Sequence, residues 1–208
     1  KVRGTPAPAL EELAVARTAR QRVDLLISHP KCEALVPTLP AEDLYFTMKE
    51  VGLSDCVELV RLASAEQFRA FVDLDAWKRD QLDPAAALTW LRAAGTDDSE
   101  ERFRKKLHGL DVEVLELVLR QTTRVYDLED DPDPDPEGVT FRSPEGKYLV
   151  EYLVEGAEQA GVKRVLDELY AEDPLRTARL LEAVRWEMPS ELEETAFRAV
   201  LPALFAVR

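Results

Sequence analysis

The sequence repeats itself with an offset of 24 residues, and this periodicity limits the folds open to the chain more than any other feature. The first and second copies match at six positions, namely Cys32, Leu35, Val36, Ala41, Glu42 and Leu44 against Cys56, Leu59, Val60, Ala65, Glu66 and Phe68. A weaker third copy follows 47 residues later, with Leu107, Leu110, Asp111, Val112, Glu113 and Leu115 after Val60, Ala63, Ser64, Ala65, Glu66 and Phe68. Repeats of this length are typical of supersecondary units that stack on one another.

Each unit is predicted to be a short helix, a tight turn and a second short helix, because helix-start residues recur at one position of the repeat. Pro40 suits a first helical turn, and Ser64 with Gln67 matches a capping box. The other starts are Asp111, Asp83 before Pro84, Asp173 before Pro174, and Ser190 with Glu193. Apolar spacing also predicts a long first helix over residues 9–27.

The predicted fold class is therefore mainly α, built from short helices that stack as an α-superhelix or solenoid over residues 30–120. Helices this short cannot bury their apolar faces alone, so neighbouring units must cover them. The residues expected in the shared core are Leu35, Leu44, Leu59, Val60, Phe68 and Leu115.

Strand periodicity interrupts the helical pattern at residues 122–152. Apolar and polar residues alternate there at Thr123, Val125, Val139, Phe141, Tyr148, Val150 and Tyr152, and residues 143–146 form a predicted turn. We expect a small β hairpin whose connecting loop, residues 127–137, is extended and mobile because acidic residues alternate there with prolines. Three regions result: helical repeats at 1–121, the β excursion at 122–152, and C-terminal helices at 153–208 that pack on the same domain.

Charge limits the classes of partner. Lys and Arg total 27 against 41 for Asp and Glu, and the net charge of -14 repels nucleic acid and anionic membrane surfaces. No apolar run approaches the roughly 18 residues of a membrane span, and the first residues lack a secretory pattern. We expect a cytoplasmic protein, and the composition indicates a GC-rich bacterial genome. Because the chain begins at Lys1, we also expect it to be a piece of a longer protein.

No catalytic constellation is predicted. A nucleophile needs a base held by a third group. Of the two histidines, His29 is expected in a loop or at a helix start and His108 at a helix end. Gly156 and Gly161 have phosphate-loop spacing, but Val162 stands where the lysine is required, which argues against nucleotide hydrolysis. We therefore predict no catalytic residues and no cofactor-binding residues.

Metal chemistry has one candidate location. Asp130, Asp131, Asp133 and Asp135 offer oxygen ligands that Mg²⁺ or Ca²⁺ accepts, although an EF-hand beginning at Asp127 would need glycine where Pro132 stands. A solvated acidic loop is the alternative. A zinc site from His29, Cys32 and Cys56 is not expected, because structural zinc needs four close ligands. A disulfide between the two cysteines is not expected either, because equivalent positions on stacked helices lie about 8–10 Å apart. The cysteines are expected to be buried, reduced thiols.

The segment from Leu39 to Leu44, followed by Val51, Gly52, Leu59 and Val60, resembles the repeats of the cytoplasmic N-terminal domain of MgtE-type magnesium transporters. The flagellar rotor protein FliG has similar helical units. This resemblance covers residues 25–120 and implies a fold rather than ion binding. The chain as a whole, especially the stretch from Leu39 to Trp90 and the segment from Phe141 to Tyr148, resembles an uncharacterised bacterial family of unknown function.

Three functional hypotheses follow. The first is a non-catalytic protein-interaction or regulatory module, because helical repeats offer broad surfaces and the charge favours a basic or cation-bridged partner. The second is a divalent-cation sensor that uses the 127–137 loop. The third is an enzyme. Trp77, Trp90 and Trp186 are the aromatic candidates for a binding surface, and the helical spacing of Phe71, Leu74 and Trp77 places Trp77 in the core.

Overall fold

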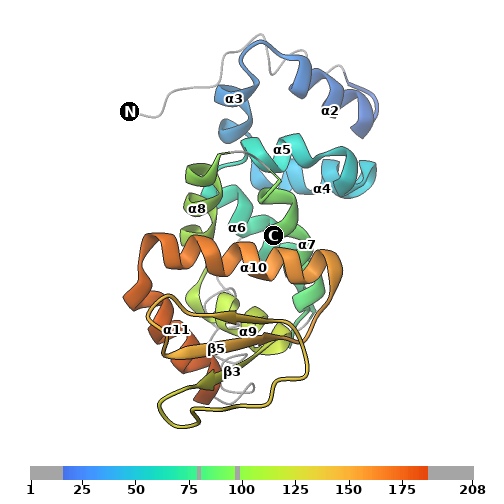
Figure 1. Ribbon diagram of the computed structural model, residues 1–208. Helices are drawn as coiled ribbons and strands as arrows, with labels where there is room; N and C mark the ends of the chain where they lie inside the picture. The colour runs from blue at the N-terminus through green and yellow to red at the C-terminus, as the bar shows by residue number, and fades with distance from the viewer. Residues whose placement is uncertain (1–15, 79–80, 97–98, 187–208) are drawn as a thin grey trace.

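The computed structural model describes residues 16–78, 81–96 and 99–186 (Figure 1). The first half contains α2 (Ala19–Ser28), α3 (Cys32–Leu35), η1 (Val36–Thr38), α4 (Ala41–Val51), η2 (Leu53–Asp55), α5 (Val57–Leu62), α6 (Ala65–Ala76), β1 (Trp77–Lys78) and β2 (Gln81–Leu82). Next come α7 (Pro84–Ala94), α8 (Glu100–Gly109), α9 (Val112–Thr122), β3 (Thr123–Asp127), β4 (Thr140–Arg142), β5 (Tyr148–Tyr152), α10 (Gly156–Glu172) and α11 (Pro174–Trp186). The protein is mainly helical, as predicted, and the described helices are each too short or too polar to traverse a bilayer.

The internal repeat is visible in where the helices begin. Helix α4 begins at Ala41, α6 at Ala65 and α9 at Val112, which reproduces the intervals of 24 and 47 residues in the sequence. In Figure 1 the units follow one another from α2 at the top to α9 in the lower half, and α6 contacts α4, α7 and α8. The six predicted core residues are all buried: Leu35, Leu44, Leu59, Val60, Phe68 and Leu115.

Local capping explains several of these starts. The predicted capping box is present: the Gln67 amide donates to Ser64 Oγ at 3.1 Å, and the Ser64 amide donates to Gln67 Oε1 at 2.9 Å. Gln67 Nε2 also donates to the carbonyls of Val36 and Leu39, at 2.8 and 2.7 Å. Gln67, which completes the capping box of α6, therefore also joins this helix to the preceding unit.

Other predicted starts differ in detail. Pro40 is the N-cap of α4 rather than a first-turn residue, and Asp111 caps α9 without a side-chain hydrogen bond because its carboxylate binds Arg69 Nη2 at 2.6 Å. Among the described residues the first helix begins at Ala19, where Thr18 accepts a capping bond, so the helix predicted over 9–27 is wrong at residues 16–18. The part of that prediction before residue 16 lies outside the described residues. The predicted start at Ser190 and Glu193 also lies outside them.

The β excursion exists, and it has one strand more than a hairpin. Antiparallel strands lie in the order β3-β5-β4, with Val125 opposite Val150 and Phe141 opposite the same residue from the other side. The predicted turn joins β4 to β5, where the Gly146 amide donates to the Ser143 carbonyl at 2.9 Å and Gly146 has a φ of 79°. A second pairing, Trp77 with Leu82 in β1 and β2, was not predicted.

Helices α10 and α11 close the lower part of the molecule. Helix α10 contacts α7, α8 and α9, and α11 packs against α9 and β3. Figure 1 shows α10 crossing in front of the repeat helices, with the sheet beneath it. This packing brings residues of the C-terminal helices beside residues of the repeat helices.

A buried carboxylate in α6 makes a pH-dependent contribution to stability. Asp73 is 4% exposed, and burial raises its pKa to about 6, although Arg69 at 3.6 Å opposes the rise. Because this folded-state pKa lies above the ordinary 3.8, stability falls as pH rises from about 4 to about 6 and stays lower above that window.

Replacing Asp73 by asparagine should therefore raise the free energy of unfolding by about 2 kcal/mol at pH 7.5, and by little near pH 4. Urea unfolding at the two pH values measures the difference. Glu66→Gln, which changes an exposed carboxylate on the same helix, is the matched control and should not raise the free energy of unfolding at pH 7.5. A gap between Asp73→Asn and wild type that is the same at both pH values would contradict the assignment.

Candidate functional site

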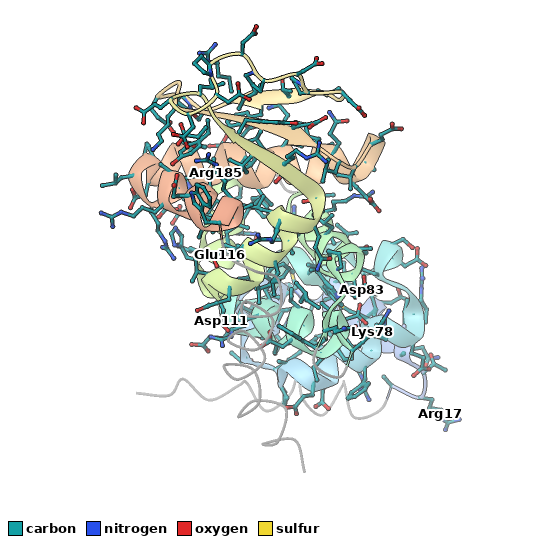
Figure 2. All side chains as sticks on the ribbon, turned by 90° about the horizontal axis from the view of Figure 1, so that it is seen from below. Arg17, Lys78, Asp83, Asp111, Glu116 and Arg185 are labelled. Atoms are coloured by element: carbon teal, nitrogen blue, oxygen red, sulfur yellow. The ribbon has the colours of Figure 1, made fainter. Side chains whose placement is uncertain are left out.

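The acidic loop, residues 127–137, is fixed at its first residue by a buried carboxylate. Asp127 is 5% exposed and ends β3; it accepts a hydrogen bond from the Glu129 amide at 2.9 Å. Lys147 Nζ and Arg185 Nη1 both lie 3.4 Å from Asp127 Oδ2 (Arg185 is labelled in Figure 2). Burial alone would raise the pKa of Asp127, but the amide and the two cations hold it below its ordinary value.

A second buried carboxylate fixes the end of the acidic loop. Glu151, on the central strand β5, is 3% exposed and accepts hydrogen bonds from the Glu137 and Gly138 amides at 2.8 and 2.9 Å. It also accepts one from the Tyr126 hydroxyl at 2.7 Å, which is the main reason that its pKa is lowered. Both ends of the acidic loop are thus held by carboxylates of the sheet.

Between these anchors, most carboxylates of the acidic loop face solvent. Asp130 binds Arg185 Nη2 at 2.6 Å, and Glu129 lies 3.6 Å from Lys147 Nζ. The remaining four are exposed and make no ion pair with a described residue: Asp131, Asp133, Asp135 and Glu137. The acidic loop therefore displays an acidic edge, as the sequence predicted. The sequence did not predict that both ends of the loop are fixed.

The predicted metal ligands lie along this edge. Of Asp130, Asp131, Asp133 and Asp135, the first is bound to Arg185 and the other three point their charge at solvent without an ionic partner. Over the residues that the structure describes, no three His, Cys, Asp or Glu side chains are grouped to hold a metal ion. Cation binding at these four residues stays a prediction.

The two histidines and the buried cysteine, the side chains that could act as base or nucleophile, lie apart from one another. His29 caps the end of α2, where its Nδ1 accepts from the Lys31 amide at 3.1 Å. His108, in the last turn of α8, contacts Glu172 through Nε2 and lies 3.2 Å from Arg176 Nη1 through Nδ1. Cys56 is buried, as predicted, and burial raises the pKa of its thiol, which makes it a weak nucleophile. Cys32 was also predicted to be buried, but it is only half-buried.

The tryptophans divide between core and surface. Trp77 is 8% exposed, as predicted, and Trp90 is fully buried. Trp186 is 64% exposed at the end of α11, where its indole donates to Glu182 and Arg185 lies over its ring.

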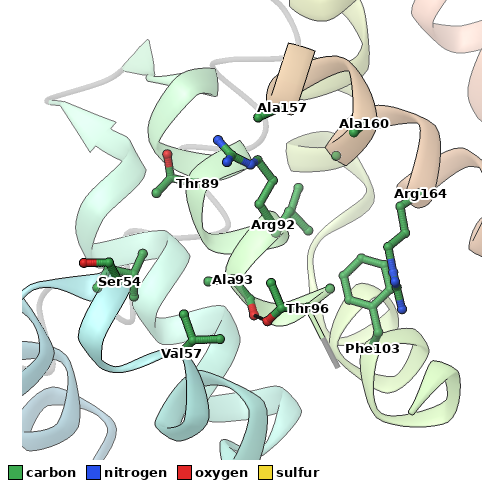
Figure 3. A pocket seen from close by; sticks show the side chains of 14 residues that line it. Ser54, Val57, Thr89, Arg92, Ala93, Thr96, Phe103, Ala157, Ala160 and Arg164 are labelled. Carbon is green, nitrogen blue, oxygen red and sulfur yellow. Dashed lines mark hydrogen bonds between the residues drawn. The ribbon is translucent and has the colours of Figure 1, made fainter. Parts of the chain in front are cut away.

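A cleft of about 500 Å³ opens where α10 meets the repeat helices (Figure 3). We call it the arginine cleft, because Arg92 of α7 and Arg164 of α10 are the charged residues among those that line it. Its other described lining residues are Leu53, Ser54, Val57, Thr89, Leu91, Ala93, Gly95, Thr96, Phe103, Ala157, Ala160 and Gly161. The sequence did not predict this cleft, because Gly161 was considered there only as part of an incomplete phosphate-loop motif.

Comparison with known proteins gives a family without an assigned activity. A sequence model described as a family of unknown function (DUF6178) matches residues 4–199. No curated protein and no solved structure matches the chain. The acidic loop and the arginine cleft are the features of the structure that bear on function.

Proposed function

We infer that this chain, which belongs to the DUF6178 family of unknown function, acts as a non-catalytic protein-interaction module whose acidic loop docks on a basic surface of its partner. One observation carries the proposal: two buried carboxylates, Asp127 and Glu151, hold the ends of a loop whose other carboxylates mostly face solvent. The similarity of residues 25–120 to the MgtE-type N-terminal domain stays a prediction, and it is compatible with a regulatory module.

The anchors matter because buried charge is unfavourable unless it is fully bonded. Here Asp127 accepts from one backbone amide of the acidic loop, and Glu151 accepts from the last amide of the loop and from the next one. These interactions fix the backbone rather than serve chemistry. Pro132, Pro134 and Pro136 restrict the backbone further between Asp131 and Glu137. A loop whose ends are fixed in advance loses less conformational entropy when a partner binds. The predicted mobility between the two ends stays a prediction.

Electrostatics indicates the kind of partner. The exposed carboxylates of the acidic loop add a local negative field to a chain whose net charge is already -14. Such a surface steers a basic partner toward it and gives an association rate that falls with ionic strength. Loops held on a rigid scaffold are also where binding residues concentrate.

The test uses a loop variant in which Asp131, Asp133 and Asp135 become asparagine and Glu137 becomes glutamine. We expect the wild-type chain to retain basic proteins from a native lysate at low salt, and the loop variant to retain them at least about tenfold less. Quantitative mass spectrometry of the retained proteins, at low and at high salt, measures this.

A control variant carries the same change of charge elsewhere: Glu42, Glu50, Glu66 and Glu158 to glutamine, all exposed and without an ion pair to a described residue. It should bind like wild type. Equal loss in both variants would show that net charge, not the acidic loop, is responsible. If millimolar Mg²⁺ or Ca²⁺ instead raises the melting temperature and replacing Asp130, Asp131, Asp133 and Asp135 abolishes the rise, the cation-sensing alternative is correct.

A further inference from the structure

We propose that the arginine cleft binds a small organic anion with an apolar body, held through a carboxylate or phosphate group. This inference is independent of the acidic loop, which lies on another part of the molecule. It starts from a contrast in charge. In a chain with 41 acidic residues, none of the described residues that line this cleft carries a carboxylate, whereas two carry a guanidinium.

The two arginines reach the cleft by a reciprocal packing of α7 and α10. The stem of Arg92 crosses Gly161, where an added Cβ would lie only 2.7 Å from Arg92 Cγ. In the same way, the stem of Arg164 crosses Gly95, where an added Cβ would lie 3.1 Å from Arg164 Cδ. Each glycine makes room for the arginine of the opposite element, so both side chains are positioned by close packing rather than by chance exposure.

The guanidinium groups lie on different walls of the cleft. Figure 3 shows Arg92 beside Thr89 and Ala157, and Arg164 along the ring of Phe103. The centre of the Arg164 guanidinium is 5.2 Å from the Phe103 ring centroid, a cation–π distance that orients it. Arg92 is exposed and makes no ion pair with a described residue, so its charge is available to an anion.

The remaining walls supply apolar contact and hydroxyl groups. Leu53, Val57, Ala93 and Ala160 line the cleft with apolar groups, and Ser54 adds a hydroxyl. A volume of about 500 Å³ falls in the range of small-molecule sites, which are mostly apolar with a few polar groups that fix orientation. A forked guanidinium suits planar carboxylates and phosphates alike. The chemistry therefore points to an amphipathic organic anion rather than a bare inorganic ion.

The fluorescent probe 8-anilinonaphthalene-1-sulfonate combines an anion with an apolar body and provides a direct test. We expect saturable binding of one probe per chain, with an affinity about tenfold lower in Arg92→Met, which removes a charge-assisted interaction. Arg92→Lys, which keeps the charge, should recover part of the affinity. Nile red, which is neutral and apolar, should bind wild type and Arg92→Met equally.

The matched control is Arg142→Met, which removes one positive charge from an exposed residue of β4 outside the cleft. It should bind the probe like wild type, and thermal unfolding should show that both methionine variants are folded. Competition by octanoate identifies a carboxylate ligand and competition by phenyl phosphate identifies a phosphate ligand, and either supports the proposal. Equal probe affinities for Arg92→Met and Arg142→Met, or no competition by either anion, would overturn it.

Discussion

Replacing Trp90 by alanine should lower the free energy of unfolding by about 4 kcal/mol, because the change removes the largest fully buried side chain among the described residues. Trp90 packs against Phe71 and Tyr45, with ring centroids 5.3 and 6.1 Å away. Its indole Nε1 donates to Asp75 Oδ2 at 2.9 Å, so alanine also removes one of the hydrogen bonds that Asp75 accepts. Truncation therefore creates a cavity and weakens a polar network that joins α4, α6 and α7.

Urea unfolding monitored by far-ultraviolet circular dichroism measures this loss. Trp186→Ala is the matched control, because Trp186 is 64% exposed and its removal should change the free energy of unfolding by less than about 1 kcal/mol. If both variants lose the same small free energy of unfolding, then α4, α6 and α7 do not share a core around Trp90.

Replacing Glu151 by alanine should destabilise the protein by about 3 kcal/mol at neutral pH, because three donors lose a charged acceptor inside the sheet. These donors are the Tyr126 hydroxyl and the amides of Glu137 and Gly138. The same variant should free the C-terminal end of the acidic loop. Limited proteolysis should then show faster cleavage near that end of the loop than in wild type.

The effect of Glu151→Ala should depend on pH. The folded-state pKa of Glu151 lies below its ordinary 4.5, so its stabilisation is complete above about pH 4.5 and is lost as pH falls through the lowered pKa. The gap between wild type and variant should therefore shrink in acid. Arg124→Ala is the control: its side chain is 60% exposed and 3.7 Å from Glu151, so its loss should be within about 1 kcal/mol. A gap that stays constant from neutral pH to about pH 3 would refute the role of the carboxylate.

Patterns that depend on neighbouring residues were predictable from the sequence. The capping box at Ser64, the starts at Asp83 and Asp173, and the turn at Ser143 all involve groups within a few residues of one another. Glu66, in the first turn of α6, and Glu113, in that of α9, also lie where the helix dipole favours them. The periodic core followed from the same local spacing.

Features that depend on distant residues were not predictable. Nothing near Glu151 in the sequence indicates that it accepts from amides 13 and 14 residues earlier, or that Arg185 binds Asp127 across 58 residues. The arginine cleft needs Gly161 against Arg92 and Gly95 against Arg164, pairings that only the packing of α10 on α7 creates. The charge of the acidic loop could be foreseen, but its anchoring and the cleft required the fold.

The strand order β3-β5-β4 has a consequence for how this region is made. The central strand is the last of the three along the chain, so β3 and β4 have no strand partner until residues 148–152 have been synthesised. Until then, Asp127 lacks Arg185 and the Glu137 amide lacks Glu151, and the acidic segment emerges from the ribosome without either anchor. Sheet, loop and α11 are therefore expected to form in one late step, governed by contacts of high sequence separation.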